Sequence, residues 1–134
     1  MGQFANDLAK FEAKTSEKLD LAVRKIALEL FSRIIMRTPV DTGRARANWQ
    51  VAIGTIPSGT LELNDKSGQA TINKVQAASM GLVAGDVIYL TNNLPYAVPL
   101  EEGYSQQAPA GMVALTVQDF QSVVAQIGIE LVMV

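Results

Sequence analysis

The chain has 134 residues, of which 49% are hydrophobic and 18% are charged, and its formal net charge is −2. This length suits one domain, which we expect to span residues 1–134. The sequence contains no cysteine and no histidine, which excludes disulfides, the usual zinc sites, thiol nucleophiles and Ser-His-Asp catalysis. We therefore expect no metal, no cofactor and no catalytic residue.

The apolar surplus and the uneven charge both favour a protein that assembles. The charged share lies below the usual value of about 25%, and apolar surface beyond the needs of a small core leaves water at a subunit interface. Residues 1–49 hold nine Lys or Arg and six Asp or Glu (+3), and residues 50–134 hold two and seven (−5), which together give −2. Opposite-signed parts suit head-to-tail subunit contacts, although uneven charge also arises by chance. The net charge indicates no basic field for nucleic acid.

The sequence predicts no targeting or membrane segment. The first residues lack a basic region followed by an apolar run, so no signal peptide is expected. The longest uncharged run, residues 103–118, is interrupted by Pro109 and is too short to span a bilayer. We expect no membrane contact and synthesis in a cytoplasm.

A long helix is predicted from about Gln3 to Arg37, because apolar residues recur there at helical spacing. Its first half is amphipathic and its second half is apolar on two sides. We therefore expect the start of the helix to be wetted and its end to be buried. Pro39 ends the helix.

A turn and a first strand are predicted next. Asp41-Thr42-Gly43 is typical of a turn, in which Asp41 or Thr42 caps a short helical turn that runs through Asn48. Residues 49–54 alternate and are rich in β-forming side chains, which predicts a strand.

The middle of the chain is predicted to hold a loop, a helix and a second strand. Residues 55–68 are rich in Gly, Ser, Asn and Asp and indicate a loop or a long hairpin tip, with room for a short strand at residues 60–63. Residues 69–80 look helical and end at a glycine. Residues 87–91 predict the second strand.

The last part of the chain is predicted to close the domain with a helix. Residues 96–111 indicate an irregular stretch, and the closing helix is expected from Met112 to about Ile127. Residues 129–134 suit either a last helical turn or a strand, packed on the sheet or on a neighbour. The predicted inner side of the closing helix consists of Val113, Val117, Phe120, Val124 and Ile127.

The Asp-Thr-Gly triplet at residues 41–43 is the one sharp enzymatic pattern. Aspartic proteases share a proton between two such Asp carboxylates, and a short chain can supply the pair by dimerising. Here the triplet follows a long helix and Pro39 instead of a strand, and Arg44 and Arg46 come after it. Asp41 is therefore interpreted as a cap and ion-pair partner, and a dimeric aspartic protease using Asp41 stays a distant alternative.

Two other charged clusters favour contacts over chemistry. Glu101 and Glu102 are adjacent, and since neighbouring side chains point in different directions they indicate an acidic surface or interface and not an opposed acid–base pair. Arg44 and Arg46, with two more arginines shortly before them, concentrate positive charge around one turn. Ion pairing is favoured over phosphate contact there, because no nucleic-acid-binding pattern accompanies the arginines.

The aromatic residues of this region have two readings. Tyr96 and Tyr104 occupy loop positions, where amphipathic aromatic side chains suit an interface. Tyr89 in the second strand suits the core equally well. Trp49 is an interface candidate for which core filling is an even alternative.

Two segments, taken together, resemble a known family. The first is RTPVDTGRARANW at residues 37–49, directly after the long helix. The second is IYLTNNLPYAVPLEEGY at residues 88–104, followed by a Pro-Ala-Gly break and the closing helix. Their order and spacing resemble the minor tail or tail-completion proteins of long-tailed bacteriophages, also called neck proteins. The likeness extends over nearly the whole chain.

The resemblance implies an α+β fold: a small, largely antiparallel sheet with a long N-terminal helix, a middle helix and a C-terminal helix packed on it. It also implies a virion structural subunit that forms a ring, hexameric by the resemblance, at the head-proximal end of the tail. The implied partners are copies of the chain, the tail tube or tail terminator protein, the head–tail connector proteins, and genomic DNA if it passes through the lumen. A tail terminator or head–tail connector (head-closure) protein is the alternative.

The residues that we expect at structural or subunit-interface positions lie in these two segments. Reversing the charge of both arginines of the first segment is expected to weaken assembly and to leave the subunit folded. The candidates are Asp41, Arg44, Arg46, Trp49, Tyr96, Glu101, Glu102 and Tyr104.

Overall fold

The computed structural model describes residues 2–103, 105, 107 and 111–132. The predicted α+β fold is confirmed, with helices and one antiparallel pair of strands in the described residues. In chain order the elements are α1 (Gly2–Arg37), α2 (Arg44–Ala47), β1 (Trp49–Ile53), α3 (Gln69–Ser79), β2 (Ile88–Asn92), α4 (Ala97–Glu101), α5 (Met112–Gln118) and α6 (Phe120–Val132).

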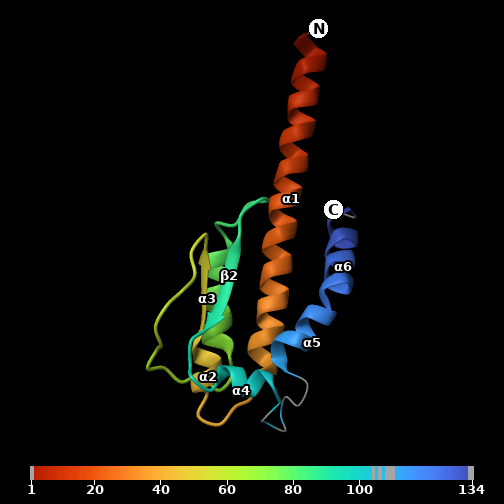
Figure 1. Ribbon diagram of the computed structural model, residues 1–134. Coiled ribbons are helices and arrows are strands. Elements are labelled where there is room, and N and C mark those ends of the chain that lie inside the picture. Colours follow the sequence, from red (N-terminus) through yellow and green to blue (C-terminus); the bar gives the residue numbers. More distant parts are fainter. Residues whose placement is uncertain (1, 104, 106, 108–110, 133–134) are drawn as a thin grey trace.

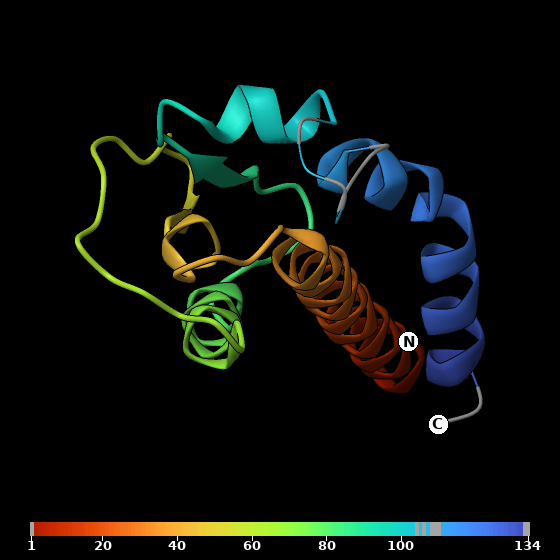
Figure 2. The same cartoon turned by 90° about the horizontal axis from the view of Figure 1, so that it is seen from below.

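The long helix α1 is the axis of the molecule, and its predicted bounds are confirmed (Figure 1). Around its C-terminal half, the sheet and α3 lie on one side and α5 and α6 on the other (Figure 2). Its N-terminal half, residues 2–19, extends beyond the rest of the molecule (Figure 1). We call this part the projecting segment. The expected wetted start and buried end of the helix are therefore confirmed.

The core forms where the buried end of α1 meets the sheet and the later helices. Ile34 and Ile35 of α1 pack with Trp49, Val75 and Met112, which come from β1, α3 and α5. Ile35 and Val75 are fully buried. Since apolar burial is the main driving force of folding, this cluster ties four elements of the chain together.

A second, smaller cluster joins α6 to α1. Val123 and Ile127 are buried against the α1 residues Ala22, Ile26 and Leu30. These three residues recur at a spacing of four, so they form one continuous strip along the helix. The strip continues into the projecting segment.

Within the residues that the structure describes, the sheet consists of two strands. β1 and β2 pair antiparallel, with Trp49 opposite Asn92 and Ile53 opposite Ile88. The loop of residues 55–68 and the helix α3 connect them. The short strand considered at residues 60–63 does not form; these residues carry no regular secondary structure.

The predicted closing helix is wrong in one respect, because it is two helices that meet at Asp119. The buried residues Met112, Thr116, Val123 and Ile127 keep one helical spacing across the interruption, so the inner side is rotated relative to the expected one. Val117 is 65% exposed and Phe120 is 50% exposed, whereas Thr116 and Val123 are buried. The polar Thr116 can be buried because its hydroxyl donates to the Met112 carbonyl (2.8 Å).

Two smaller differences concern the same part of the chain. The stretch expected to be irregular contains the short helix α4, whose turn is closed by backbone bonds such as Leu100 N–H to the Tyr96 carbonyl. The backbone of α6 continues helically to Val132, so the helical alternative for the chain end is confirmed up to that residue. Residues 133–134 lie outside the described residues. Among the helices of the described residues, none is long and apolar enough to cross a membrane.

Candidate assembly site

The end of α1 is closed by a chain of buried hydrogen bonds. The indole N–H of Trp49 donates to the Thr38 hydroxyl (2.8 Å), and that hydroxyl donates to the Ile34 carbonyl (2.7 Å). Trp49 is 7% exposed. The structure therefore places this interface candidate in the core, where it fixes the chain as it leaves the helix.

Arg46 holds the same region together through backbone carbonyls. Its guanidinium donates to the carbonyls of Thr38 (3.0 Å), Lys66 (2.7 Å) and Met36 (2.8 Å). Burial lowers the pKa of Arg46, and the nearby Asp65 carboxylate works in the opposite direction. Because all three acceptors belong to the same fold, reversing this charge would disturb the subunit itself. These bonds give Arg46 a role within the subunit fold, and its place at a subunit interface stays a prediction.

Gly43 lets the loop of residues 55–68 lie directly on the turn. Its φ is +88°, and a Cβ at this position would lie 2.5 Å from the backbone nitrogen of Lys66. The Gly43 carbonyl accepts the N–H of Asp65 (2.9 Å). A positive φ and so close a backbone approach both require glycine.

Asp65 in turn fixes the start of α3. Its carboxylate accepts the backbone N–H (2.8 Å) and the hydroxyl (2.7 Å) of Thr71. Burial by itself raises the pKa of Asp65, but the hydrogen bonds from Thr71, Gly68 and Ser67 outweigh it, so the pKa is lowered. The turn, the loop and α3 thus form one hydrogen-bonded unit.

Asn48 is a structural residue that the sequence did not reveal. It is fully buried, and its side-chain amide both donates to the Leu61 carbonyl (3.0 Å) and accepts the Leu61 N–H (2.7 Å). This pair of bonds gives the loop a partner where no strand forms. Nothing in the local pattern distinguishes it from an exposed asparagine, because its partner lies thirteen residues away.

The exposed part of the turn differs from the expected cap. Gly43 occupies the N-cap position of α2 without a side-chain cap bond, although the Thr42 hydroxyl accepts the Arg44 N–H (3.2 Å). Asp41 is exposed and makes no hydrogen bond or ion pair with the described residues. Arg44 contacts Glu62 at 3.4 Å instead, and its Nε is buried without a partner among the described atoms. The interpretation of Asp41 as a cap and ion-pair partner is therefore wrong.

The two acidic candidates have different roles. Glu101 accepts the backbone N–H groups of Val113 (2.8 Å) and Ala114 (2.9 Å), so it satisfies the start of α5. Glu102 is exposed. Gly111 is needed for this cap, because its φ is +83° and a Cβ there would lie 2.5 Å from the Glu101 carbonyl oxygen.

The structure brings the two motif segments together at one end of the molecule. The Asn92 side chain donates to the Ala45 carbonyl (2.9 Å). Next to this bond lies an open pocket of about 290 Å³. Asp41 and Arg44 line it on one side, and Tyr96 and the α4 residue Leu100 also line it. We call it the turn pocket. Tyr96 is 39% exposed there, whereas Tyr89 is half-buried in β2 and Tyr104 lies outside the described residues.

On the other side of α1, a charged group holds α5 and α6 in place. Asp119, between these two helices, pairs with Arg33 (3.0 Å) and Arg37 (2.9 Å) of α1. The hydrogen bond from Arg33 lowers the pKa of Asp119, and Arg37 adds to the effect. The hydrogen bonds that Arg33 donates to Glu29 and to Asp119 raise its pKa, with the bond to Glu29 as the largest cause.

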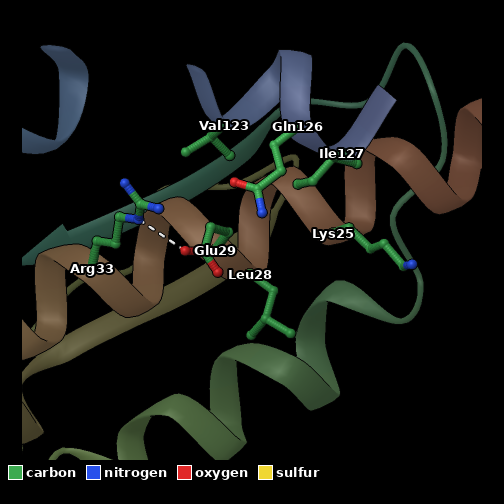
Figure 3. Close-up of a pocket in the computed structure, with 7 residues that line it drawn as sticks. All are labelled: Lys25, Leu28, Glu29, Arg33, Val123, Gln126 and Ile127. Carbon is green, nitrogen blue, oxygen red and sulfur yellow. Dashed lines mark hydrogen bonds and ion pairs between the residues drawn. The ribbon is translucent and has the colours of Figure 1, made fainter. Parts of the chain in front are cut away.

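A pocket of about 310 Å³ lies beside this group, between α1 and α6. Figure 3 shows Glu29 and Arg33, joined by their ion pair (2.8 Å), across from Val123 and Gln126 of α6. Of its charged lining residues, Glu29 and Arg33 are paired with each other, and Lys25 lies further along α1. Within the described part of the chain, no group of three or more acidic side chains is placed to hold a metal ion.

The projecting segment of α1 presents large exposed apolar side chains. Phe4 is 74% exposed, Leu8 is 47% exposed and Leu19 is 53% exposed. Exposed apolar groups aligned on one element typically mark a contact surface. The sequence pattern had shown this strip, and the predicted wetted start of the helix agrees with its lack of a cover in the isolated subunit.

Comparison with protein families identifies the chain through most of its length. Residues 2–103 match the model of a family described as "Bacteriophage HK97-gp10, putative tail-component". This range contains nearly all of both motif segments but not α5 and α6, although Met112 of α5 is part of the core. No curated protein and no solved structure matches the chain.

Proposed function

Because the chain belongs to the HK97-gp10-like family of bacteriophage tail components, we propose that it is a tail-completion (neck) subunit. In this proposal, residues 1–134 form a single domain that assembles into a ring at the head-proximal end of the tail and joins the tail to the head connector. The resemblance found in the sequence is confirmed at the level of a phage tail family. Membership of this family implies a place in the virion and contacts with other tail or head proteins.

The observation that carries the proposal is the meeting of the two segments that resemble tail-completion proteins. They are far apart in sequence, yet both line the turn pocket. Asp41, Arg44 and Tyr96 give the pocket a mixed polar and aromatic lining, and the exposed Glu102 follows directly after α4. Aromatic and arginine side chains are favoured at protein interfaces, so we assign this surface to a contact with a neighbouring subunit or connector protein.

A ring also requires two different surfaces that fit each other, since each subunit contacts its neighbours head to tail. The turn pocket, at the end of the molecule opposite the projecting segment (Figure 1), supplies one of these surfaces. The proposal assigns the protein a role in assembly and no catalytic role. Arg46, Trp49 and Glu101 support the surface from within the fold.

A nonsense mutation of the gene in its phage tests the proposal. Loss of a neck subunit should leave DNA-filled heads and tails of normal length that accumulate separately, as seen by electron microscopy of the lysate. A plasmid copy of the wild-type gene should restore complete particles. Tails of abnormal length would instead indicate a tail terminator, and absence of tails would indicate an earlier role in tail assembly; either result contradicts the neck position.

A complementation series tests the surface itself. Arg44→Glu and Tyr96→Ser are expected to give folded protein that fails to restore joining, because both side chains face the turn pocket. Lys74→Glu, an equal charge reversal at an exposed position of α3, is the matched control and should complement fully. Full complementation by both pocket variants would refute the assignment of this surface.

A further inference from the structure

We infer that the projecting segment is a pairing surface for a second copy of this chain, and that two copies pack antiparallel along it. The inference goes beyond the neck proposal, because it concerns the chain in the absence of any other tail protein. It does not depend on where in the virion the protein sits.

The apolar strip of the projecting segment continues a seam that is already filled in the body of the molecule. Phe4, Leu8 and Leu19 lie on the face of α1 that carries Ala22 and Ile26 further along the helix. In the body, that face is covered by α6, which stops short of the projecting segment (Figure 1). The uncovered strip therefore offers a second helix the face that α6 covers further along α1.

The charges beside the strip select a second copy of the chain in antiparallel orientation. Asp7, Lys14 and Lys18 lie on one flank of the strip. When Phe4 of one copy is set opposite Leu19 of an antiparallel second copy, Asp7 falls between Lys14 and Lys18 of that copy. The two-fold symmetry repeats this contact, so each copy supplies both signs of charge.

A parallel pair does not have this property. In an antiparallel pair of helices, each flank of the strip meets the same flank of the second copy. In a parallel pair, each flank meets the opposite flank of the second copy, which would leave Asp7 away from both lysines. Within one copy these charged side chains make few contacts. Among the described residues, Asp7 accepts a hydrogen bond from Gln3 (3.0 Å), and the ion pairs involve residues outside the segment.

Helix physics gives a further reason for a partner. A helix that is not packed on anything is marginal in water unless it is long, and most helical stability in proteins comes from burying an apolar face. The described side chains of residues 2–19 are all exposed in the single chain. Pairing would remove Phe4, Leu8 and Leu19 of both copies from water together.

Sedimentation of the full-length protein over a range of concentrations, at low ionic strength, tests the pairing. The wild type is expected to be a dimer that dissociates on dilution, and the Phe4→Ala/Leu8→Ala variant is expected to stay monomeric. Circular dichroism shows whether each variant keeps its fold. A wild-type protein that is monomeric at every concentration would overturn the inference, and the strip would then belong to a different tail protein.

Charge swaps test the antiparallel register. Asp7→Lys should weaken the dimer by about tenfold, since it replaces two attractive contacts by repulsive ones. The triple variant Asp7→Lys/Lys14→Glu/Lys18→Glu should restore the dimer, because it exchanges the signs on both sides. Lys10→Glu, on the side of the helix away from the strip, is the matched control and should change little. If none of these substitutions changed the affinity of the dimer, the proposed antiparallel register would be overturned.

Single cysteines report the orientation directly, since the wild-type chain has none. In the antiparallel register Leu8 lies opposite position 15 of the second copy. A mixture of the Leu8→Cys and Thr15→Cys variants should therefore cross-link between the two variants under oxidation, whereas each variant alone should cross-link poorly. Efficient cross-linking of Leu8→Cys with itself would indicate a parallel pair and contradict the inference.

Discussion

The buried half of α1, residues 20–37, lies between the sheet and α3 on one side and α5 and α6 on the other (Figure 2). The projecting segment of the same helix carries a similar apolar strip, but its described side chains are exposed (Figure 1). One helical pattern therefore serves two purposes. In the body it fills a core, and beyond the body it offers a surface to a partner.

The most direct way to break this comparison is to truncate one apolar side chain in each half. Ile35→Ala should lower the free energy of unfolding by about 2–5 kcal/mol, because the side chain is fully buried and its loss leaves a cavity. Leu8→Ala, at a site 47% exposed, should change it by about 0.5 kcal/mol or less. Urea unfolding at a protein concentration low enough to exclude pairing measures both. Equal losses would mean that the projecting segment is packed within the subunit.

Glycine substitutions sharpen the account of how the loop of residues 55–68 is fixed to the end of α1. Gly43 and Gly54 both have positive φ. A Cβ added at Gly43 would clash with backbone atoms of the loop, whereas a Cβ added at Gly54 would have no atom within 4 Å. Gly54→Ala should cost about 1–2 kcal/mol from its backbone conformation alone. Gly43→Ala should cost about 1–3 kcal/mol more, because the loop must move away. Thermal unfolding compares the two, and equal costs would contradict the close contact.

Removing one hydrogen bond at the end of α1 should have a smaller effect. Trp49→Phe keeps most of the apolar volume but loses the bond to the Thr38 hydroxyl. We expect a loss of about 1–2 kcal/mol in the free energy of unfolding. In the Thr38→Val background, which also lacks this hydroxyl, the same substitution should cost clearly less. An equal cost in both backgrounds would show that the bond contributes nothing.

The smallest expected effect is a pH dependence at Asp119, where α5 and α6 are held to α1. The pKa of this carboxyl is lowered from 3.8 by Arg33 and Arg37. A group whose pKa is lowered by folding adds stability above its unfolded pKa and loses it as pH falls through the folded value. Asp119→Asn should therefore be less stable than the wild type at pH 6.

The difference between these two proteins should shrink as the pH is lowered below about 4 and also when salt is added at neutral pH. Urea unfolding at several pH values follows it. A difference that stays constant down to pH 2 would contradict the ion pairs as its cause. The test isolates the contacts that fasten α5 and α6 to the buried half of α1.

The sequence predicted the parts of the structure that depend on local patterns. The long helix, the turn at Gly43 and the two strands follow from helical spacing, proline, glycine and alternation. The break at Asp119 was missed, because the apolar residues on both sides of it continue one helical period and nothing local marks the interruption. The break becomes understandable only when Arg33 and Arg37, far away in sequence, are seen to bind Asp119.

The same limit applies to the candidate site. The sequence located the two motif segments, and the structure shows which of their residues face outward. Asp41, Arg44, Tyr96 and Glu102 remain predicted interface residues on an accessible surface. Glu101 was expected in an acidic patch, yet it caps α5 through bonds that span twelve or more residues. Such partners cannot be inferred from residue type and local spacing.

The copy number of this chain in purified virions, measured by quantitative mass spectrometry against the portal protein, tests the neck proposal most directly. The proposal predicts the few copies of one small ring, hexameric by the resemblance, in every particle and independent of tail length. Copies in proportion to tail length would identify a tube component. Absence from the particle would contradict the structural role altogether.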